Sequence, residues 1–129
     1  MGRLGRSCWT RNMVKQSYVP ARGDIVWITL DPYKGHEQVG RRPSLVLSPK
    51  TYNGRVKLAL ICPITSHAKG YPFEVLLEEQ GRKTGGVILA DQVRIADWQT
   101  RKAVFIEKVS HKILEEVVEQ LISLFTEEA

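Results

Sequence analysis

Short extended segments separated by turn residues are the feature that most restricts how this chain can fold. The first, 24–31 (DIVWITLD), is rich in β-branched and aromatic residues and is apolar on both faces, as buried strands are. Gly23 precedes it and Asp31-Pro32 follows it, which is typical of strand ends. Further runs of this kind predict strands at 44–48, 56–64, 71–77, 87–89, 91–95 and 103–109.

Turn signals indicate how some of these segments are connected. Pro43 and Pro49 bracket the second segment, and Asn53-Gly54 is a strong turn signal before the third. We therefore interpret residues 43–64 as a hairpin whose connection is longer than a tight turn. The segment 91–95 alternates polar and apolar residues, as an edge strand does.

One amphipathic helix is expected after the strands. Ser110 is a suitable N-cap residue. Beyond it, apolar residues recur at the i, i+3, i+4 spacing of one helix face: Ile113, Leu114, Val117, Val118, Leu121, Ile122 and Phe125. This order predicts a mainly β fold with α: a small, strongly bent, partly closed antiparallel β-barrel of roughly five to seven strands, capped by a C-terminal amphipathic helix.

The length of 129 residues suits a single domain that needs neither disulfides nor a metal to fold. We expect that domain at 18–129, preceded by a flexible basic extension at 1–17. Met13 is a plausible alternative start, so residues 1–12 are set apart from the fold. No apolar run approaches the roughly 20 residues of a membrane helix, and the N-terminus lacks the apolar block of a secretory signal. With only two cysteines, Cys8 and Cys62, a reducing cytoplasm is the simplest compartment.

The net charge is +5, but its distribution matters more than its sum. Residues 1–23 contain cations and no acid, whereas residues 113–129 contain glutamates and no cation. The body between them is therefore basic, and the acidic end masks it in the total. A basic face suits a phosphate chain, although ordinary surface charge that keeps a protein soluble explains it equally well.

Common catalytic motifs are absent. The sequence contains no GxxxxGK[ST] loop, no GxGxxG and no nucleophile elbow. His36, His67 and His111 are far apart in sequence, and neither HExxH nor a paired CxxC occurs. We therefore expect no zinc site and no cofactor.

Polar side chains gather in the loop 32–43: Lys34, His36, Glu37, Gln38, Arg41 and Arg42. A polar loop held by a rigid sheet is a common place for binding or catalysis, although in an arbitrary protein a solvated connection is the commoner case. Further polar residues lie at other strand ends: Thr65, Ser66, Lys69, Asp91 and Gln92. Strand ends that are distant in sequence converge on one surface when a barrel closes.

Three stretches, in order, closely resemble the MazF/PemK-type toxins of bacterial toxin–antitoxin modules: GDIVWITLDPYKGHEQVGRRPSLVLSP, CPITSHAKGYPFEV and GGVILADQVRIADW. The resemblance covers about residues 18–124. It implies an SH3-like barrel, a homodimer, and a metal-independent, sequence-selective endoribonuclease. Such an enzyme cuts single-stranded RNA, chiefly messenger RNA, and so inhibits translation and growth. A cognate acidic antitoxin would block the RNA groove at the dimer interface.

The resemblance also implies site residues. The family's essential arginine matches Arg42 in the GRRP segment, its essential threonine matches Thr65 in PITS, and the acid of its EQ pair matches Glu37. One branch carries a catalytic arginine two residues before the acid of the D-Q pair, and this chain departs from that branch with Leu89. The family's RNA-contacting positions match His36, Gln38, Asp91 and Gln92, and Lys69, the cation before Tyr71, is expected to bind RNA with them.

RNA cleavage without a metal requires that the 2′-hydroxyl lose a proton, that the phosphorane charge be stabilised and that the 5′-oxygen gain a proton. Arg42 would hold the non-bridging phosphate oxygens, mainly electrostatically, because its very high pKa makes it a poor proton carrier. Thr65 can donate to the phosphate or relay a proton, and Glu37 is the general base by type. The expected products are a 2′,3′-cyclic phosphate and a 5′-hydroxyl.

Plainer interpretations stay open for the same residues. Glu37 can pair with Arg41 or Arg42 and only shape the loop, and Thr65 can cap a turn. Trp27 and Phe73 are interpreted as core rather than as base-stacking platforms, Trp98 as a partner contact or a lid over the core, and Cys62 as a small buried apolar residue.

Two other functions also stay open. On the same barrel, a non-enzymatic toxin can poison DNA gyrase, but that class relies on a tryptophan-glycine-isoleucine end, whereas this sequence finishes FTEEA. The third alternative is a catalytically silent SH3-like module that binds nucleic acid or protein.

Overall fold

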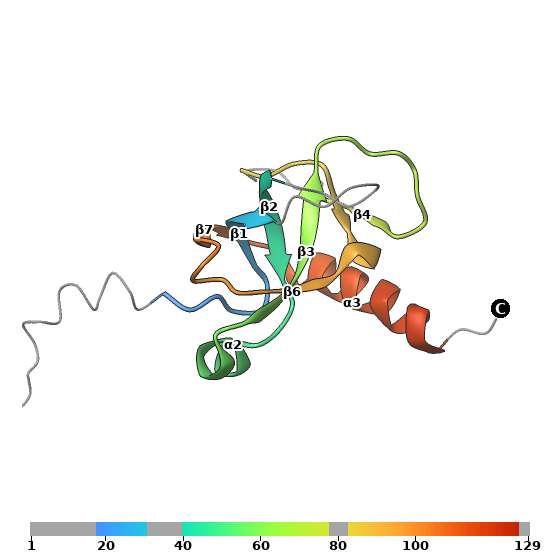
Figure 1. Ribbon diagram of the computed structural model, residues 1–129. Coiled ribbons are helices and arrows are strands. Elements are labelled where there is room, and N and C mark those ends of the chain that lie inside the picture. Colours follow the sequence, from blue (N-terminus) through green and yellow to red (C-terminus); the bar gives the residue numbers. More distant parts are fainter. Residues whose placement is uncertain (1–17, 31–39, 78–82, 127–129) are drawn as a thin grey trace, which may run out of the picture.

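Seven strands form one antiparallel sheet in the computed structural model, which describes residues 18–30, 40–77 and 83–126 (Figure 1). The strands are β1 (Asp24–Leu30), β2 (Gly40–Val46), β3 (Ala59–Thr65), β4 (Glu74–Leu76), β5 (Val87–Leu89), β6 (Arg94–Ala96) and β7 (Val104–Lys108). The helical elements are α2 (Lys50–Val56), the 3-10 turn η1 (Ala90–Gln92) and α3 (His111–Thr126).

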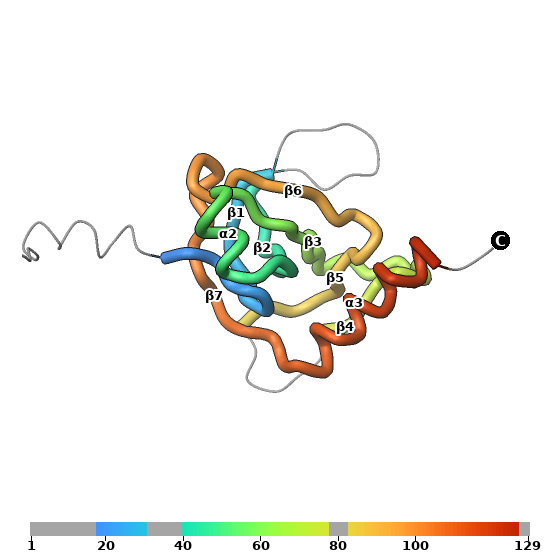
Figure 2. The backbone as a smooth tube through the Cα atoms, turned by 90° about the horizontal axis from the view of Figure 1, so that it is seen from below, coloured from blue at the N-terminus to red at the C-terminus, as the bar shows by residue number. Residues whose placement is uncertain are grey.

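The strand order is β4-β5-β3-β2-β1-β7, with β6 also paired to β3. Figure 2 shows the strands bent around a common centre, with α3 along one side. Within the described residues, β4 and β7 end the path without pairing to each other, so the bent sheet is not fully closed. The predicted fold class, a mainly β antiparallel sheet with a C-terminal helix, is confirmed.

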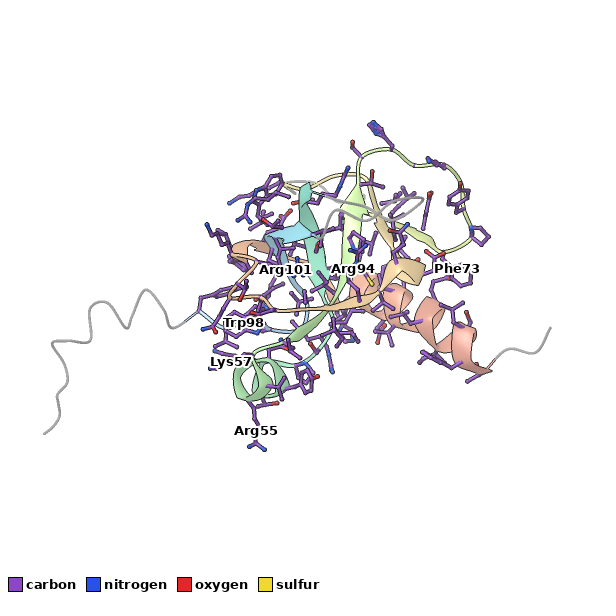
Figure 3. The ribbon with its side chains drawn as sticks, viewed as in Figure 1. Arg55, Lys57, Phe73, Arg94, Trp98 and Arg101 are labelled. Carbon is purple, nitrogen blue, oxygen red and sulfur yellow. The ribbon has the colours of Figure 1, made fainter. Side chains whose placement is uncertain are left out.

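Alternate residues of β1, β2 and β3 enter two apolar clusters. Ile25, Leu45 and Cys62 belong to the first, which also buries Ile113 and Val117 of α3. The second contains Val26, Ile28, Val46, Ile61 and Trp98. Because successive side chains of a strand point to opposite faces, both faces of these strands are buried. Figure 3 labels two aromatic residues of this core: Phe73, which packs against the first cluster, lies beside α3, and Trp98, a member of the second, lies near α2.

The C-terminal helix begins where the sequence predicts it. The backbone N–H of Ile113 donates to Oγ of Ser110 at 3.2 Å, so the predicted N-cap is confirmed. Ile113 and Val117 are buried, whereas Val118, Ile122 and Phe125 are exposed. Only part of the predicted apolar face therefore packs on the sheet. None of the helices that the structure describes is long and apolar enough to cross a membrane.

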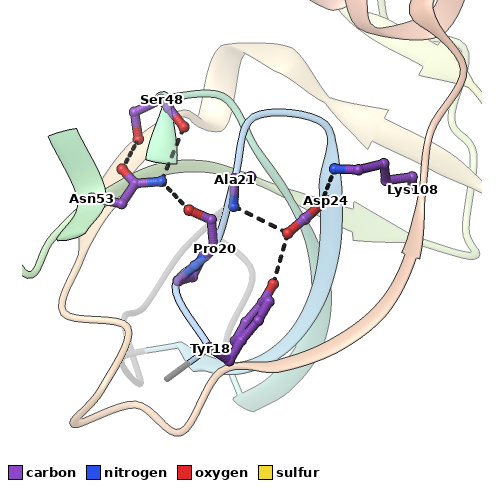
Figure 4. Close-up of polar contacts among 7 residues, drawn as sticks. All are labelled: Tyr18, Pro20, Ala21, Asp24, Ser48, Asn53 and Lys108. Carbon is purple, nitrogen blue, oxygen red and sulfur yellow. Dashed lines mark hydrogen bonds and ion pairs between the residues drawn. The ribbon is translucent and has the colours of Figure 1, made fainter. Parts of the chain in front are cut away.

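The turn predicted at Asn53-Gly54 is wrong, because α2 occupies that position. The Asn53 side chain is fully buried: its Nδ2 donates to the carbonyls of Pro20 (2.7 Å) and Ser48 (3.0 Å), and its Oδ1 accepts from Oγ of Ser48 at 2.5 Å (Figure 4). These tertiary hydrogen bonds outweigh the local turn preference. The hairpin pairing itself is confirmed, since β2 and β3 run antiparallel on either side of α2.

Several predicted strand bounds also differ from the structure: β3 begins at Ala59 rather than at residue 56, and β4 covers only Glu74–Leu76 of the predicted 71–77. β2 begins at Gly40 rather than at residue 44 and includes Pro43, opposite Trp27, because the φ of proline suits an extended backbone. Asp91 and Gln92 lie in η1, so the predicted strand 91–95 is wrong over its first half. The chain must turn there, since β5 pairs with one end of β3 and β6 with the other.

Candidate active site

Strand register brings the first two candidate residues together from distant parts of the sequence. β2 and β3 pair with Ser44 opposite Pro63. Continued by two residues in both strands, this register places Arg42 of β2 opposite Thr65 of β3. Directly opposed residues of an antiparallel pair share one face of the sheet, with Cβ atoms about 4.5–5.5 Å apart. The extended register thus brings the Arg42 and Thr65 positions to the same end of the two strands, two residues beyond the last paired residues, Ser44 and Pro63.

A cavity of about 470 Å³ borders Arg42. Its lining comes from β1, β2, the end of β3, the segment 83–85 and β7: Trp27, Arg42, Pro43, Ile64, Ser66, Lys83, Thr84, Gly85 and Ile106. Thr65 lies between two of these residues, Ile64 and Ser66, and is not itself a lining residue, since its side chain takes the other face of the strand. The cavity combines cations and hydroxyls with an apolar wall, and Arg42 is the candidate residue that lines it.

Thr65 is held firmly at the end of β3. It is 7% exposed, and its Oγ1 accepts a hydrogen bond from the backbone N–H of His67 at 3.2 Å. This bond caps the turn after β3, which is the plainer role that the sequence left open. A hydroxyl that accepts one bond still has a proton to donate, so the cap is compatible with donation to a phosphate.

Gly86 packs directly against the backbone of Thr65. A Cβ at Gly86 would lie 2.1 Å from the carbonyl oxygen of Thr65, and Gly86 has a φ of +103°. Both the contact and the backbone conformation therefore require glycine. The position of Thr65 depends on this close approach between β3 and the start of β5.

The adjacent arginines Arg41 and Arg42 have different surroundings. Nη1 of Arg41 donates to Oγ1 of Thr29 (2.9 Å) and to the carbonyl of Arg101 (3.2 Å), and Nη2 donates to the carbonyl of Lys102 (2.7 Å). Arg41 thus ties the start of β2 to β1 and to the turn before β7. Arg42 lines the cavity instead, beside Pro43.

Glu107 of β7 holds the cavity wall formed by residues 83–85. Its two carboxylate oxygens accept the backbone N–H groups of Lys83 (3.1 Å) and Thr84 (2.7 Å). A carboxylate that accepts two backbone donors fixes both the position and the direction of that backbone. Lys83 and Thr84 therefore border a preformed cavity.

Lys69 lies in the exposed loop between β3 and β4. The carboxylate of Glu74 accepts the backbone N–H groups of Lys69 (3.1 Å to Oε2) and Gly70 (3.0 Å to Oε1), which orders this loop. The cavity lining comes from other segments. Lys69 is thus a surface cation on an anchored loop.

Asp91 and Gln92 lie in η1, beside the middle of β3 rather than beside its end. Sγ of Cys62 lies 3.8 Å from the carbonyl of Ala90, and η1 also contacts α3. Burial, and to a lesser extent the charge of Asp91, raise the pKa of Cys62 to about 12. Cys62 is 0% exposed, which confirms its interpretation as a buried apolar residue.

Glu37, His36 and Gln38 lie outside the described residues, so their predicted roles stay predictions. In the described ranges, no group of three or more His, Cys, Asp or Glu side chains is arranged to hold a metal ion.

Sequence reasoning missed Trp27, which it assigned to the core. The side chain is 41% exposed and lines the cavity, whereas its neighbours Val26 and Ile28 are 0% and 1% exposed. The sequence did contain an indication that this face is exposed. Thr29 is polar, and because it follows Trp27 by two residues it lies on the same face of the strand. No pattern in the sequence indicated that Lys83 and Ser66 line the same cavity as Arg42. The prediction for Phe73 is confirmed, since it packs on the core, and Trp98, left open between a partner contact and a lid, is a buried member of the second cluster.

Comparison with known proteins identifies the family. The family model described as "PemK-like, MazF-like toxin of type II toxin-antitoxin system" matches residues 21–125. The "Endoribonuclease toxin MazF" of Escherichia coli (strain K12) is 50% identical over 86 residues, which are 67% of this chain and 76% of that protein.

Solved structures agree with this match. The crystal structure of MazF from Deinococcus radiodurans superposes with a TM-score of 0.80 at 49% identity and covers 84% of this chain and 98% of that one. A MazE–MazF structure from the same organism superposes with a TM-score of 0.75 at 43% identity and covers 87% and 100%. By sequence and by fold, therefore, the chain belongs to the PemK-like, MazF-like toxins of type II toxin–antitoxin systems.

Proposed function

We propose that this toxin is an endoribonuclease that cuts single-stranded RNA, chiefly messenger RNA, at preferred sequences without a metal ion, and so inhibits translation and growth. Relatives at 35–50% identity are named endoribonucleases. The single observation that carries the proposal is a cavity lined by two cations, Arg42 and Lys83; the β2–β3 register, extended two residues beyond Ser44 and Pro63, supports a place for Thr65 near Arg42.

In the proposed mechanism, Arg42 neutralises the charge that develops on the phosphorane. Its planar guanidinium can donate two parallel hydrogen bonds to the non-bridging oxygens, and in a partly buried site these bonds are stronger than in water. Thr65 donates to the same phosphate. Glu37 acts as general base on the 2′-hydroxyl, so the products carry a 2′,3′-cyclic phosphate and a 5′-hydroxyl.

We further propose that the toxin acts in the cytoplasm as a homodimer and is silenced by an acidic antitoxin. The structure of a relative in which MazF is bound to MazE supports a protein inhibitor of this kind. The charge pattern agrees with an acidic partner, because the body between residues 24 and 112 is basic. Its binding should weaken as salt rises from low to moderate ionic strength, and affinity that does not change with salt would contradict this electrostatic picture.

Cleavage of a long single-stranded RNA in excess EDTA tests the catalytic proposal. The wild-type chain should produce discrete fragments, and Arg42→Ala should lower the rate by roughly 100- to 1,000-fold with the fold retained. Arg55→Ala is the matched control, since Arg55 lies on α2, away from the cavity, and points outward in Figure 3. Far-UV circular dichroism and the unfolding temperature check that all three proteins are folded.

Three other results of this experiment would contradict the proposal. Loss of wild-type cleavage in EDTA would mean that a metal takes part. Uncut RNA together with stalled gyrase would favour the non-enzymatic toxin on the same fold. Full activity of Arg42→Ala would remove that guanidinium from the mechanism, whatever the reaction is.

A further inference from the structure

The cavity has an aromatic wall that the proposed mechanism does not use. Trp27 lies in the middle of β1, between residues that are fully buried, yet 41% of its own side chain is exposed. Burying a tryptophan side chain is strongly favourable, so the partial exposure of this side chain to solvent requires an explanation. The exposed surface borders the cavity that also contains Arg42.

The chemistry of the lining divides into two parts. Pro43, Ile64 and Ile106 extend the apolar surface beside Trp27, and Pro43 lies directly opposite Trp27 in the β1–β2 register. Two cations, Arg42 and Lys83, and two hydroxyls, those of Ser66 and Thr84, supply the polar part. A flat apolar surface next to positive charge and hydrogen-bond donors matches a nucleotide, which has a flat base next to a phosphate.

The cavity is also preformed and of suitable size. Its volume of about 470 Å³ lies in the range of about 300–1,000 Å³ that is usual for small-molecule sites. Glu107 fixes the wall at Lys83 and Thr84, and β1 and β2 fix Trp27 and Pro43 through their pairing. A rigid cavity loses little conformational entropy when a ligand binds.

We propose that this cavity is a nucleobase subsite, in which one unpaired base of the RNA lies against Trp27 while Lys83 and Arg42 hold the phosphates beside it. The inference rests on the proposed ribonuclease function and adds a contact that positions the substrate. Because every base has a flat face, stacking contributes affinity with little sequence preference, and the hydroxyls of Ser66 and Thr84 are the groups at hand to distinguish base edges.

The test compares Trp27→Leu, Trp27→Phe and a matched control, Tyr52→Leu. Tyr52 is 40% exposed, almost the same fraction as Trp27, but lies on α2. The probe is a 2′-O-methyl oligoribonucleotide that spans a cleavage site mapped with the wild type and cannot be cut, and binding is measured by fluorescence anisotropy at fixed salt. Loss of base stacking should weaken binding by about 5- to 100-fold in Trp27→Leu, with most affinity kept in Trp27→Phe and all of it in Tyr52→Leu.

A second measurement leaves Trp27 unchanged. In a chain carrying Trp9→Phe, the emission of Trp27 should be quenched when the oligonucleotide binds, while Trp98, only 5% exposed, provides a constant background. Wild-type affinity in Trp27→Leu, or unquenched emission on binding, would overturn the subsite and leave the ribonuclease proposal intact.

The ribonuclease proposal can also fail while the subsite proposal holds, and the same probes distinguish this case. If the wild type cuts no RNA, four homopolymeric 2′-O-methyl 12-mers replace the mapped probe. Binding that depends on Trp27 without any cleavage would reject the ribonuclease proposal and retain the subsite. Absence of binding to all of these probes would overturn the subsite as well.

Discussion

The two ends of the β2–β3 pair use their polar side chains in opposite ways. At the α2 end, where α2 joins the two strands, Ser48 and Asn53 are buried and bonded to each other and to the backbone. Nε1 of Trp98 closes this end by donating to the carbonyl of Asn53 at 3.1 Å. At the cavity end, Arg42 lines an open cavity, and Thr65 lies between two of its lining residues, Ile64 and Ser66.

A second polar cluster reinforces the α2 end. The buried carboxylate of Asp24 accepts the hydroxyl of Tyr18 (2.9 Å) and the backbone N–H of Ala21 (3.0 Å), and it pairs with the ammonium of Lys108 (Figure 4). This end therefore uses polar groups to hold the chain before β1 against the sheet. The difference teaches that polar residues in this fold are structural where they are enclosed and available for chemistry where the sheet opens.

The largest effect is expected from Gly86→Ala, which would disturb the cavity end through its backbone. The new Cβ would meet the carbonyl of Thr65 at 2.1 Å in a left-handed backbone conformation. We expect the free energy of unfolding to fall by about 3 kcal/mol or more, with a more than tenfold loss of RNA cleavage as Thr65 shifts. Urea unfolding and cleavage rates check both values. Gly85→Ala is the control, because nothing lies within 4 Å of a Cβ there, and equal effects of the two substitutions would contradict the packing argument.

Asn53→Ala should break the α2 end and leave the cavity end unchanged. It removes the partners of the Pro20 and Ser48 carbonyls and of the Ser48 hydroxyl, all in a buried site. We expect the free energy of unfolding to fall by about 2–4 kcal/mol, measured by urea unfolding, with wild-type cleavage at temperatures where the variant is folded. Thr51→Ala, on the exposed face of the same helix, should change stability by less than about 0.5 kcal/mol. Cleavage lost by a folded Asn53→Ala would show that the ends are coupled.

Arg41→Ala extends the comparison to two adjacent arginines, Arg41 and Arg42. Removing the hydrogen bonds of Arg41 to Thr29, Arg101 and Lys102 should lower the free energy of unfolding by about 1–2 kcal/mol. Cleavage by the folded protein should stay within a few-fold of wild type, in contrast to Arg42→Ala. The two variants are compared by thermal unfolding and by single-turnover cleavage. The division of roles fails if Arg41→Ala reduces cleavage as much as Arg42→Ala does.

Tyr18→Phe should have the smallest effect, about 1 kcal/mol, because Asp24 retains its other donors. Burial and the Asp24 carboxylate raise the pKa of Tyr18 in the folded chain above its unfolded value near 10. The contribution of Tyr18 is therefore complete below pH about 10, and it declines above that pH, where only the unfolded chain ionises. Urea unfolding from pH 7 to 11 should show the wild type losing its advantage over Tyr18→Phe at the alkaline end; an advantage that grows with pH would contradict this.

Much of the fold follows from local patterns. Alternation and β-branched runs predicted β1, β5 and β7 to within a residue or two, and the spacing of apolar residues after Ser110 predicted α3. These features depend on neighbours in sequence, which a periodicity records. Resemblance to the family selected Arg42 and Thr65, and the antiparallel pairing of β2 with β3 brings their ends of the two strands to the same edge of the sheet.

By itself, then, the sequence determined the family, the order of strands and helix, and the residues with useful chemistry. Only the tertiary structure decided that Asn53 starts no turn, that Arg41 is structural while Arg42 lines the cavity, and that Trp27 is partly open. The physical reason is common to all three. Whether a side chain is bonded, buried or available depends on what a distant part of the chain places against it, and no local pattern contains that information.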